Sequence, residues 1–126
     1  MAVSPLINNE YYLYINNCFP KQGVSPAQYL RKFIIDKQGI AEDPTFSHTA
    51  SGLIPDPSLA EMELRAYPSS GGYELSYAVG QKIYSVTLNS NGNPLSTRIM
   101  EPYANGNTYN SGDRIFGLEL VPNGQD

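Results

Sequence analysis

His48 is the residue best suited to acid–base chemistry, because it is the only histidine in a chain of 126 residues. Imidazole exchanges its proton near neutral pH, and a carboxylate that orients the ring can turn it into a general base. Three carboxylates lie nearby in the sequence, on Glu42, Asp43 and Asp56. An enzyme that uses His48 with one of these carboxylates is therefore one hypothesis. The plainer interpretation is a surface histidine among serines and threonines.

Other catalytic signals are missing from the sequence. It contains none of the usual motifs for phosphate binding, zinc peptidases, redox dithiols or serine hydrolases. The single cysteine, Cys18, excludes an intrachain disulfide and is typical of a small buried apolar residue. One histidine and one cysteine are too few for a closed transition-metal site. We therefore expect a non-catalytic protein without a metal or cofactor.

A loop with the composition of a binding surface is predicted for residues 101–113. Tyrosine offers rigid contact area, and Asn, Ser and Gly offer adaptable hydrogen bonding, which is why binding loops favour these residue types. The side chains that we expect to bind are Tyr103, Asn105, Asn107 and Tyr109. The same residue types also form ordinary turns, so the composition alone leaves both interpretations open.

Alternating apolar and polar residues predict a hairpin around Gly80-Gln81. A two-residue turn there pairs Tyr77 with Tyr84 and Leu75 with Val86. Apolar residues then meet on one face, and a slip of one residue would destroy this match. The pattern extends to both neighbouring strands, where it pairs Leu88 with Leu95, Val86 with Thr97, Tyr84 with Ile99, Tyr73 with Ala66, Leu75 with Leu64, Tyr77 with Met62 and Glu74 with Arg65.

The segment from Leu59 to Tyr67 fits two structures. Ser58 and Glu61 read as a capping box for a helix, whereas residues 61–66 alternate as a strand does. We favour the strand, because it continues the meander.

The outward face of this predicted sheet is polar. One row across it holds Glu63, Ser76, Ser85 and Arg98, and a second row holds Arg65, Glu74, Thr87 and Ser96. Short polar side chains on a flat sheet could form a binding platform, in which we expect Glu63 and Arg98 to take part. The alternative is the solvated side of an ordinary antiparallel sheet.

The N-terminal part predicts one helix between Ser25 and Gly39. Ser25 suits the N-cap and Gly39 suits the C-terminal end. Leu30, Phe33 and Ile34 follow at the spacing i, i+3 and i+4, which places them on one apolar stripe.

The remaining elements complete an α+β fold. A strand is predicted over residues 10–15, a long loop over 40–59 and a last strand over 114–121. We expect one N-terminal helix packed on a four- to five-stranded antiparallel β-meander, with an additional N-terminal strand. The length suits a single globular domain over residues 1–126.

This order of strand, helix and antiparallel meander resembles the cystatin arrangement. The cystatin inhibitory hairpin signature, Gln-x-Val-x-Gly, has no counterpart in the residues Ala78-Val79-Gly80-Gln81. The resemblance therefore concerns topology alone and implies a role for no residue.

Charge and composition rank the classes of function. A net charge of −4 and a pI near 4.8 argue against nucleic-acid binding and suit a partner with a basic surface. Residues 1–9 lack a signal-peptide pattern and no run is long enough for a membrane span, so we expect a cytoplasmic protein. The leading hypothesis is a small acidic protein-binding module, such as an inhibitor, an immunity-type antagonist or an adaptor subunit. A small-ligand binder, which could be homo-oligomeric, is the alternative.

Overall fold

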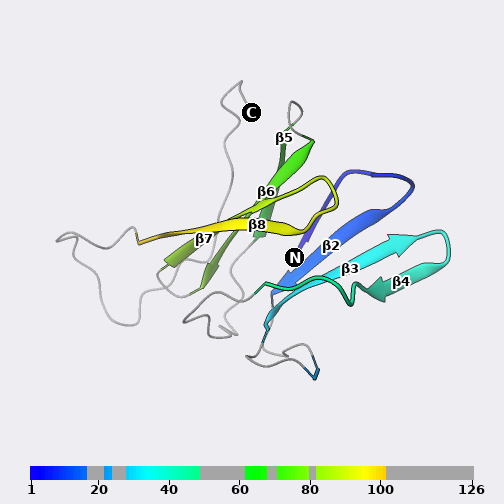
Figure 1. Cartoon of the computed structure of the whole chain (residues 1–126), viewed down its shortest axis with the longest axis horizontal. Coiled ribbons are helices and arrows are strands. Elements are labelled where there is room, and N and C mark those ends of the chain that lie inside the picture. The colour runs from blue at the N-terminus through cyan, green and yellow to red at the C-terminus, as the bar shows by residue number, and fades with distance from the viewer. Residues whose placement is uncertain (17–21, 24–27, 49–61, 68–70, 80–81, 102–126) are drawn as a thin grey trace.

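The computed structural model shows two antiparallel sheets of four strands each (Figure 1). It describes residues 1–16, 22–23, 28–48, 62–67, 71–79 and 82–101. The first sheet has the order β1-β2-β3-β4, with β1 at Ala2–Val3, β2 at Tyr11–Asn16, β3 at Leu30–Asp36 and β4 at Gly39–Glu42. The second has the order β5-β6-β7-β8, with β5 at Met62–Tyr67, β6 at Gly72–Val79, β7 at Lys82–Leu88 and β8 at Pro94–Met100.

The predicted helix between Ser25 and Gly39 is wrong. Residues 30–36 form β3, which pairs along its length with β2, and Gly39 begins β4. The described residues contain no helix, so they also contain no helix long and apolar enough to cross a membrane. The α+β fold class is therefore wrong in the described part of the chain. With the helix, the basis for the resemblance to cystatins is lost as well.

The reason lies in which side chains of β3 point inward. Leu30, Lys32 and Ile34 face the second sheet, whereas Arg31 and Phe33 face outward. Because a lysine occupies an inward position, the alternation of a half-buried strand is hidden, and the apolar spacing imitates a helix. Six residue pairs with β2 decide the outcome, and such tertiary pairing readily overrides helix propensity.

Several sequence predictions in this half need only adjustment. The strand expected over residues 10–15 is confirmed as β2, one residue later. The loop expected over residues 40–59 begins with most of β4, because Asp36 pairs with Gly39 in a tight hairpin. Residues 49–59 of that loop, residues 102–113 of the expected loop over 101–113 and the expected strand over 114–121 lie outside the described residues.

The second sheet follows the predicted register closely. The β6–β7 pairs Tyr77–Tyr84 and Leu75–Val86 are confirmed, as is the β5 strand with its Arg65–Glu74 pair. One prediction is wrong: Leu88 pairs with Pro94, not with Leu95. A register shift between Thr87 and Leu88, of the kind a β-bulge introduces, accounts for the difference.

The inner faces of both sheets supply a single hydrophobic cluster. The largest contributions are aromatic, and the ring pairs Tyr14–Phe46 and Tyr77–Tyr84 have centroids 5.9 and 5.4 Å apart. Leu75 and Val86, which belong to the same cluster, are fully buried. The core is therefore covered by a second sheet, where the sequence had predicted a helix.

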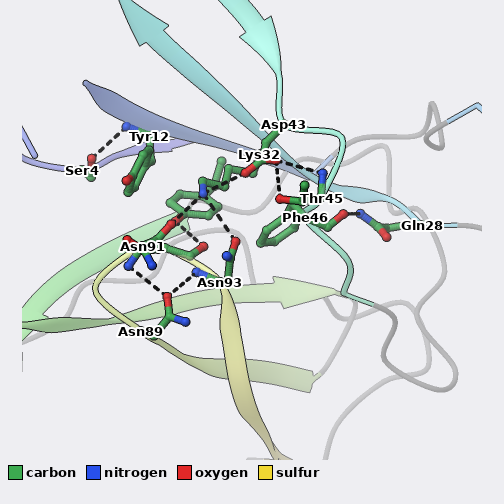
Figure 2. Close-up of polar contacts among 12 residues, drawn as sticks. Ser4, Tyr12, Gln28, Lys32, Asp43, Thr45, Phe46, Asn89, Asn91 and Asn93 are labelled. Atoms are coloured by element: carbon green, nitrogen blue, oxygen red, sulfur yellow. Dashed lines mark hydrogen bonds and ion pairs between the residues drawn. The ribbon is translucent and has the colours of Figure 1, made fainter. Parts of the chain in front are cut away.

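A buried lysine ties the two sheets together (Figure 2). The Lys32 ammonium lies 3.0 Å from the Asp43 carboxylate, donates to the Asn91 carbonyl oxygen at 2.7 Å and sits 4.1 Å from the centre of the Tyr12 ring. Asp43 also accepts from the backbone and hydroxyl of Thr45. Burial alone would raise the pKa of Asp43, but the hydrogen bonds from Thr45 and Lys32 lower it, so the carboxylate is ionised.

Hydrogen bonds hold the turn between β7 and β8 in a conformation that reaches this lysine. The Asn89 side chain accepts hydrogen bonds from the backbone of Asn91 and Asn93, which fixes the turn (Figure 2). The Tyr14 hydroxyl donates to the Gly92 carbonyl oxygen at 2.8 Å. The first sheet thus holds this turn through two side chains, a charged one and an aromatic one.

Candidate functional site

The face of the second sheet that points away from the core carries the polar rows that the alternation predicts, and two of its central residues, Ser76 and Ser85, are only 1 and 6% exposed. One row crosses the four strands as Glu63, Ser76, Ser85 and Arg98. The other runs Arg65, Glu74, Thr87 and Ser96. We refer to these two rows, together with Tyr67, as the polar face.

Glu74 is the centre of the hydrogen bonding on the polar face. Ser85 donates to one of its carboxylate oxygens at 2.6 Å, and Arg65 donates to the other at 3.1 Å. The Tyr67 hydroxyl also bonds that second oxygen. Burial by itself would raise the pKa of Glu74, but the bonds from Ser85 and Tyr67 and the charge of Arg65 lower it overall. Glu74 is therefore an ionised, fully engaged carboxylate, which suits positioning better than proton transfer.

A shallow hollow of about 310 Å³ opens beside this carboxylate. Its lining combines hydroxyl groups, one aromatic ring and both signs of charge: Tyr67, Glu74, Ser85, Thr87, Ser96, Thr97 and Arg98. Arg98 is exposed, and none of the described residues forms an ion pair or hydrogen bond with its side chain. A guanidinium with free donors at the edge of a hollow is suited to binding a carboxylate or carbonyl group.

The structure separates the two polar-face residues that the sequence singled out. Arg98 lines the hollow, whereas Glu63 lies on β5 at the opposite edge of the sheet, with two strands between them. The other expected binding residues, Tyr103, Asn105, Asn107 and Tyr109, lie outside the described residues. Sequence reasoning missed Tyr67, although it continues the outward alternation of Glu63 and Arg65 on the same strand.

His48 takes its place in the core and not on a catalytic surface. Only 5% of the residue is exposed, and its Nε2 atom lies 3.1 Å from the Tyr77 hydroxyl. Burial raises the pKa of Tyr77, so this hydroxyl keeps its proton and can donate to an unprotonated imidazole nitrogen. The described part of the chain places no carboxylate in hydrogen-bond contact with the ring and no group of three metal-binding side chains together.

The buried imidazole predicts a specific loss of stability in mild acid. Burial lowers the pKa of His48 from its usual value near 6.5, so the folded state favours the neutral ring. The unfolded chain binds the proton first as the pH falls, and the stabilisation present above pH 6.5 is lost between that value and the lower folded pKa. Urea denaturation between pH 8 and 5 should show this loss in the native protein.

A His48→Gln variant is the control for this prediction. Glutamine keeps a hydrogen-bonding group near Tyr77 but does not titrate. The variant should be less stable at pH 8 yet lose less stability than the native protein on acidification to pH 5. An unchanged pH dependence would show that His48 is not the titrating group.

No protein-family model, curated protein or solved structure matches this chain. Any account of its function therefore depends on the residues and geometry described above.

Proposed function

We propose that this chain is a non-catalytic binding module that recognises another protein through the polar face of its second sheet. The observation that carries the proposal is the Arg98 guanidinium, which has no hydrogen-bond or ion-pair partner among the described residues and lies beside the hollow around Glu74. Tyrosine and arginine are the residues that most often dominate the energy of protein interfaces, and Tyr67 and Arg98 both line this hollow.

The side chains around the hollow are already held in place, which favours binding over catalysis. Glu74 is fixed by three side chains from β5 and β7, so the hollow needs little rearrangement to accept a partner. Preorganised groups lose less conformational entropy on association and therefore bind more tightly. The net charge of −4 would steer a partner with a basic surface toward the molecule, while the Arg98 guanidinium would donate hydrogen bonds to a carboxylate or carbonyl oxygen of that partner.

The test is an Arg98→Ala variant measured against a partner found in the native host. Native mass spectrometry of the gently purified protein should show a stoichiometric second polypeptide. Calorimetry with that polypeptide should give an affinity for Arg98→Ala that is weaker by roughly thirtyfold, the effect of losing one interface hot spot. Lys37→Ala is the matched control, because it removes the same charge from an exposed position in the turn between β3 and β4.

Three outcomes separate the alternatives. If Arg98→Ala and Lys37→Ala lowered the affinity for the partner equally, net charge alone would explain the effect. That result would contradict the proposed surface. An unchanged affinity for Arg98→Ala would do the same. A small bound molecule in place of a polypeptide would support the ligand-binding alternative, for which a hollow of about 310 Å³ is large enough.

A further inference from the structure

Lys32 lies in the core between a carboxylate and a side-chain amide (Figure 2). Its Nζ atom is 3.0 Å from the Asp43 carboxylate and 3.5 Å from the Oδ1 atom of Asn93. The side chains of Lys32 and Asp43 are only 2 and 8% exposed, and Asn93 is half-buried. Both sheets contribute, because Lys32 belongs to β3, Asp43 follows β4 and Asn93 precedes β8. An amine, an amide and a carboxylate therefore meet where the two sheets pack together.

The surroundings of this amine leave it little access to water. The centre of the Tyr12 ring is 4.1 Å from Lys32 Nζ, and Tyr12 and Phe46 are 5 and 1% exposed. Removal from water activates an amine as a nucleophile, because its neutral form loses less solvation than its charged form. Asp43 is in hydrogen-bond contact with the same nitrogen and is placed to accept the proton that the amine must lose.

We propose that Lys32 and Asn93 join in an intramolecular isopeptide bond, which forms spontaneously once the two sheets have assembled. The Lys32 ammonium gives one proton to Asp43, and the resulting amine forms a bond to the Cγ atom of Asn93. The bond between Cγ and Nδ2 of Asn93 breaks, and Nδ2 leaves as ammonia with a second proton from the lysine nitrogen. The third proton stays on the new amide. Atoms and charges therefore balance without another reactant.

Asn93 is the electrophile, although Asp43 is closer to the amine. A neutral amide has a carbon that an amine can attack, whereas the negative charge of an ionised carboxylate resists attack. The backbone of Asn93 is held on both sides, because its N–H donates to the Asn89 side chain at 3.0 Å and its carbonyl accepts from the Asn89 N–H at 2.9 Å. Reacting groups held in contact gain a large advantage over separate molecules.

The reaction replaces a buried ion pair with neutral groups. The lysine nitrogen becomes an uncharged amide, and Asp43 keeps the proton that it accepted. Because two buried charges carry a large desolvation cost, their removal favours the linked state. Burial would raise the pKa of Asp43, but hydrogen bonds from Thr45 and Lys32 lower it overall, so the first proton transfer is unfavourable. We therefore expect the bond to form slowly, over hours after folding.

The bond links the two sheets across 61 residues of sequence. A cross-link that closes a long loop reduces the conformational entropy of the unfolded chain, as a disulfide does, and so stabilises the folded protein. The linked protein should unfold at a higher urea concentration than an unlinked variant. None of the three residues belongs to the polar face, so this inference does not depend on the proposed function.

Mass spectrometry of the intact folded protein tests the bond directly. The native mass should be lower than that of the sequence by one ammonia molecule, and protease digestion should release a branched peptide that joins Lys32 to Asn93. Asn93→Ala removes the electrophile and Asp43→Asn removes the proton acceptor, so both variants should keep the full mass of their sequences. Asn93→Ala also retains the ion pair of Lys32 with Asp43, which separates its effect on stability from that of the bond.

Asn91→Ala is the matched control. Asn91 lies in the same turn and is exposed, and the variant keeps the backbone carbonyl that accepts from Lys32. It should lose ammonia and give the branched peptide as the native protein does. It also excludes a cyclic imide between Asn91 and Gly92, which would release ammonia as well. Asn93 cannot form such an imide, because the next residue, Pro94, has no N–H.

Three results would overturn the proposal. The first is a native protein that keeps its full mass after prolonged incubation in the folded state. The second is a loss of ammonia that persists in Asn93→Ala, with circular dichroism showing that this variant is folded. The third is a branched peptide that joins Lys32 to Asp43 with loss of water. None of these results bears on the binding of a partner to Arg98.

Discussion

A Gly92→Ala variant should be destabilised by about 3 kcal/mol, because the new methyl group has no space and the backbone conformation disfavours it. Gly92 has a φ of +73°, in the left-handed region. A Cβ atom there would collide with the Tyr14 hydroxyl and approach the Tyr12 ring to 2.7 Å. Neither tyrosine can move away easily, since Tyr14 bonds the Gly92 carbonyl and Tyr12 packs against Lys32.

Gly23→Ala is a close control for this prediction. Gly23 has the same φ of +73°, but nothing lies within 4 Å of the position that its Cβ would take. Its substitution should cost only the backbone strain, about 1 kcal/mol. Urea denaturation of both variants gives the comparison. Equal losses would mean that the close approach of the turn to the first sheet contributes nothing to stability.

A Lys32→Met variant should lose about 3 to 5 kcal/mol, the usual consequence of breaking a buried ion pair from one side. The side chains of Lys32 and Asp43 are only 2 and 8% exposed. Methionine keeps most of the volume but leaves the Asp43 carboxylate without its cation and the Asn91 carbonyl without its donor. The penalty is therefore mainly that of uncompensated buried charge.

Two further variants distinguish this explanation from simple loss of packing. Adding Asp43→Asn to Lys32→Met removes the carboxylate charge while keeping an acceptor for Thr45, so part of the lost stability should return. Arg31→Met breaks the neighbouring ion pair, whose side chains are 21 and 26% exposed, and should cost about 1 kcal/mol or less. No recovery in the double variant would contradict the charge explanation.

The second sheet could be predicted because its pattern is local and regular. Tyr73, Leu75 and Tyr77 alternate with polar residues, and so do Tyr84, Val86 and Leu88. Two such strands joined by a short turn have one register in which apolar residues meet, and the structure adopts it. The prediction failed only at Leu95. A register shift there moves the pairing of residues out of step with the alternation along the strand.

Apart from β2, the first sheet could not be predicted, because buried residues in and beside β3 do not look like core. Lys32 on β3 and Gln28, two residues before that strand, are both buried, at 2 and 1% exposed. Their partners are remote or irregular: the Asn91 carbonyl is 59 residues from Lys32, and Gln28 donates to the backbone of Leu30 and Phe46. From the sequence alone, a charged residue is expected to face solvent, because the group that compensates its charge is not known.

The sequence predicted one part of the candidate site and missed another. The rows that contain Glu63, Glu74 and Arg98 follow from alternation and register. That Glu74 is held by three donors, and that Arg98 stands beside a hollow while Glu63 does not, depends on side-chain positions across three strands. Alternation along one strand carries no information on those distances.

The sequence by itself determined which residues of the second sheet face the core, its register and its polar outer surface, because these depend on neighbours a few positions apart. Only the tertiary structure decided that residues 30–36 form a strand and that Lys32 lies inside. Those outcomes depend on pairing with β2 and on contact with the Asn89–Asn93 turn. Such long-range interactions outweigh local helical spacing because the buried charge and the sheet hydrogen bonds are satisfied only when both sheets are assembled.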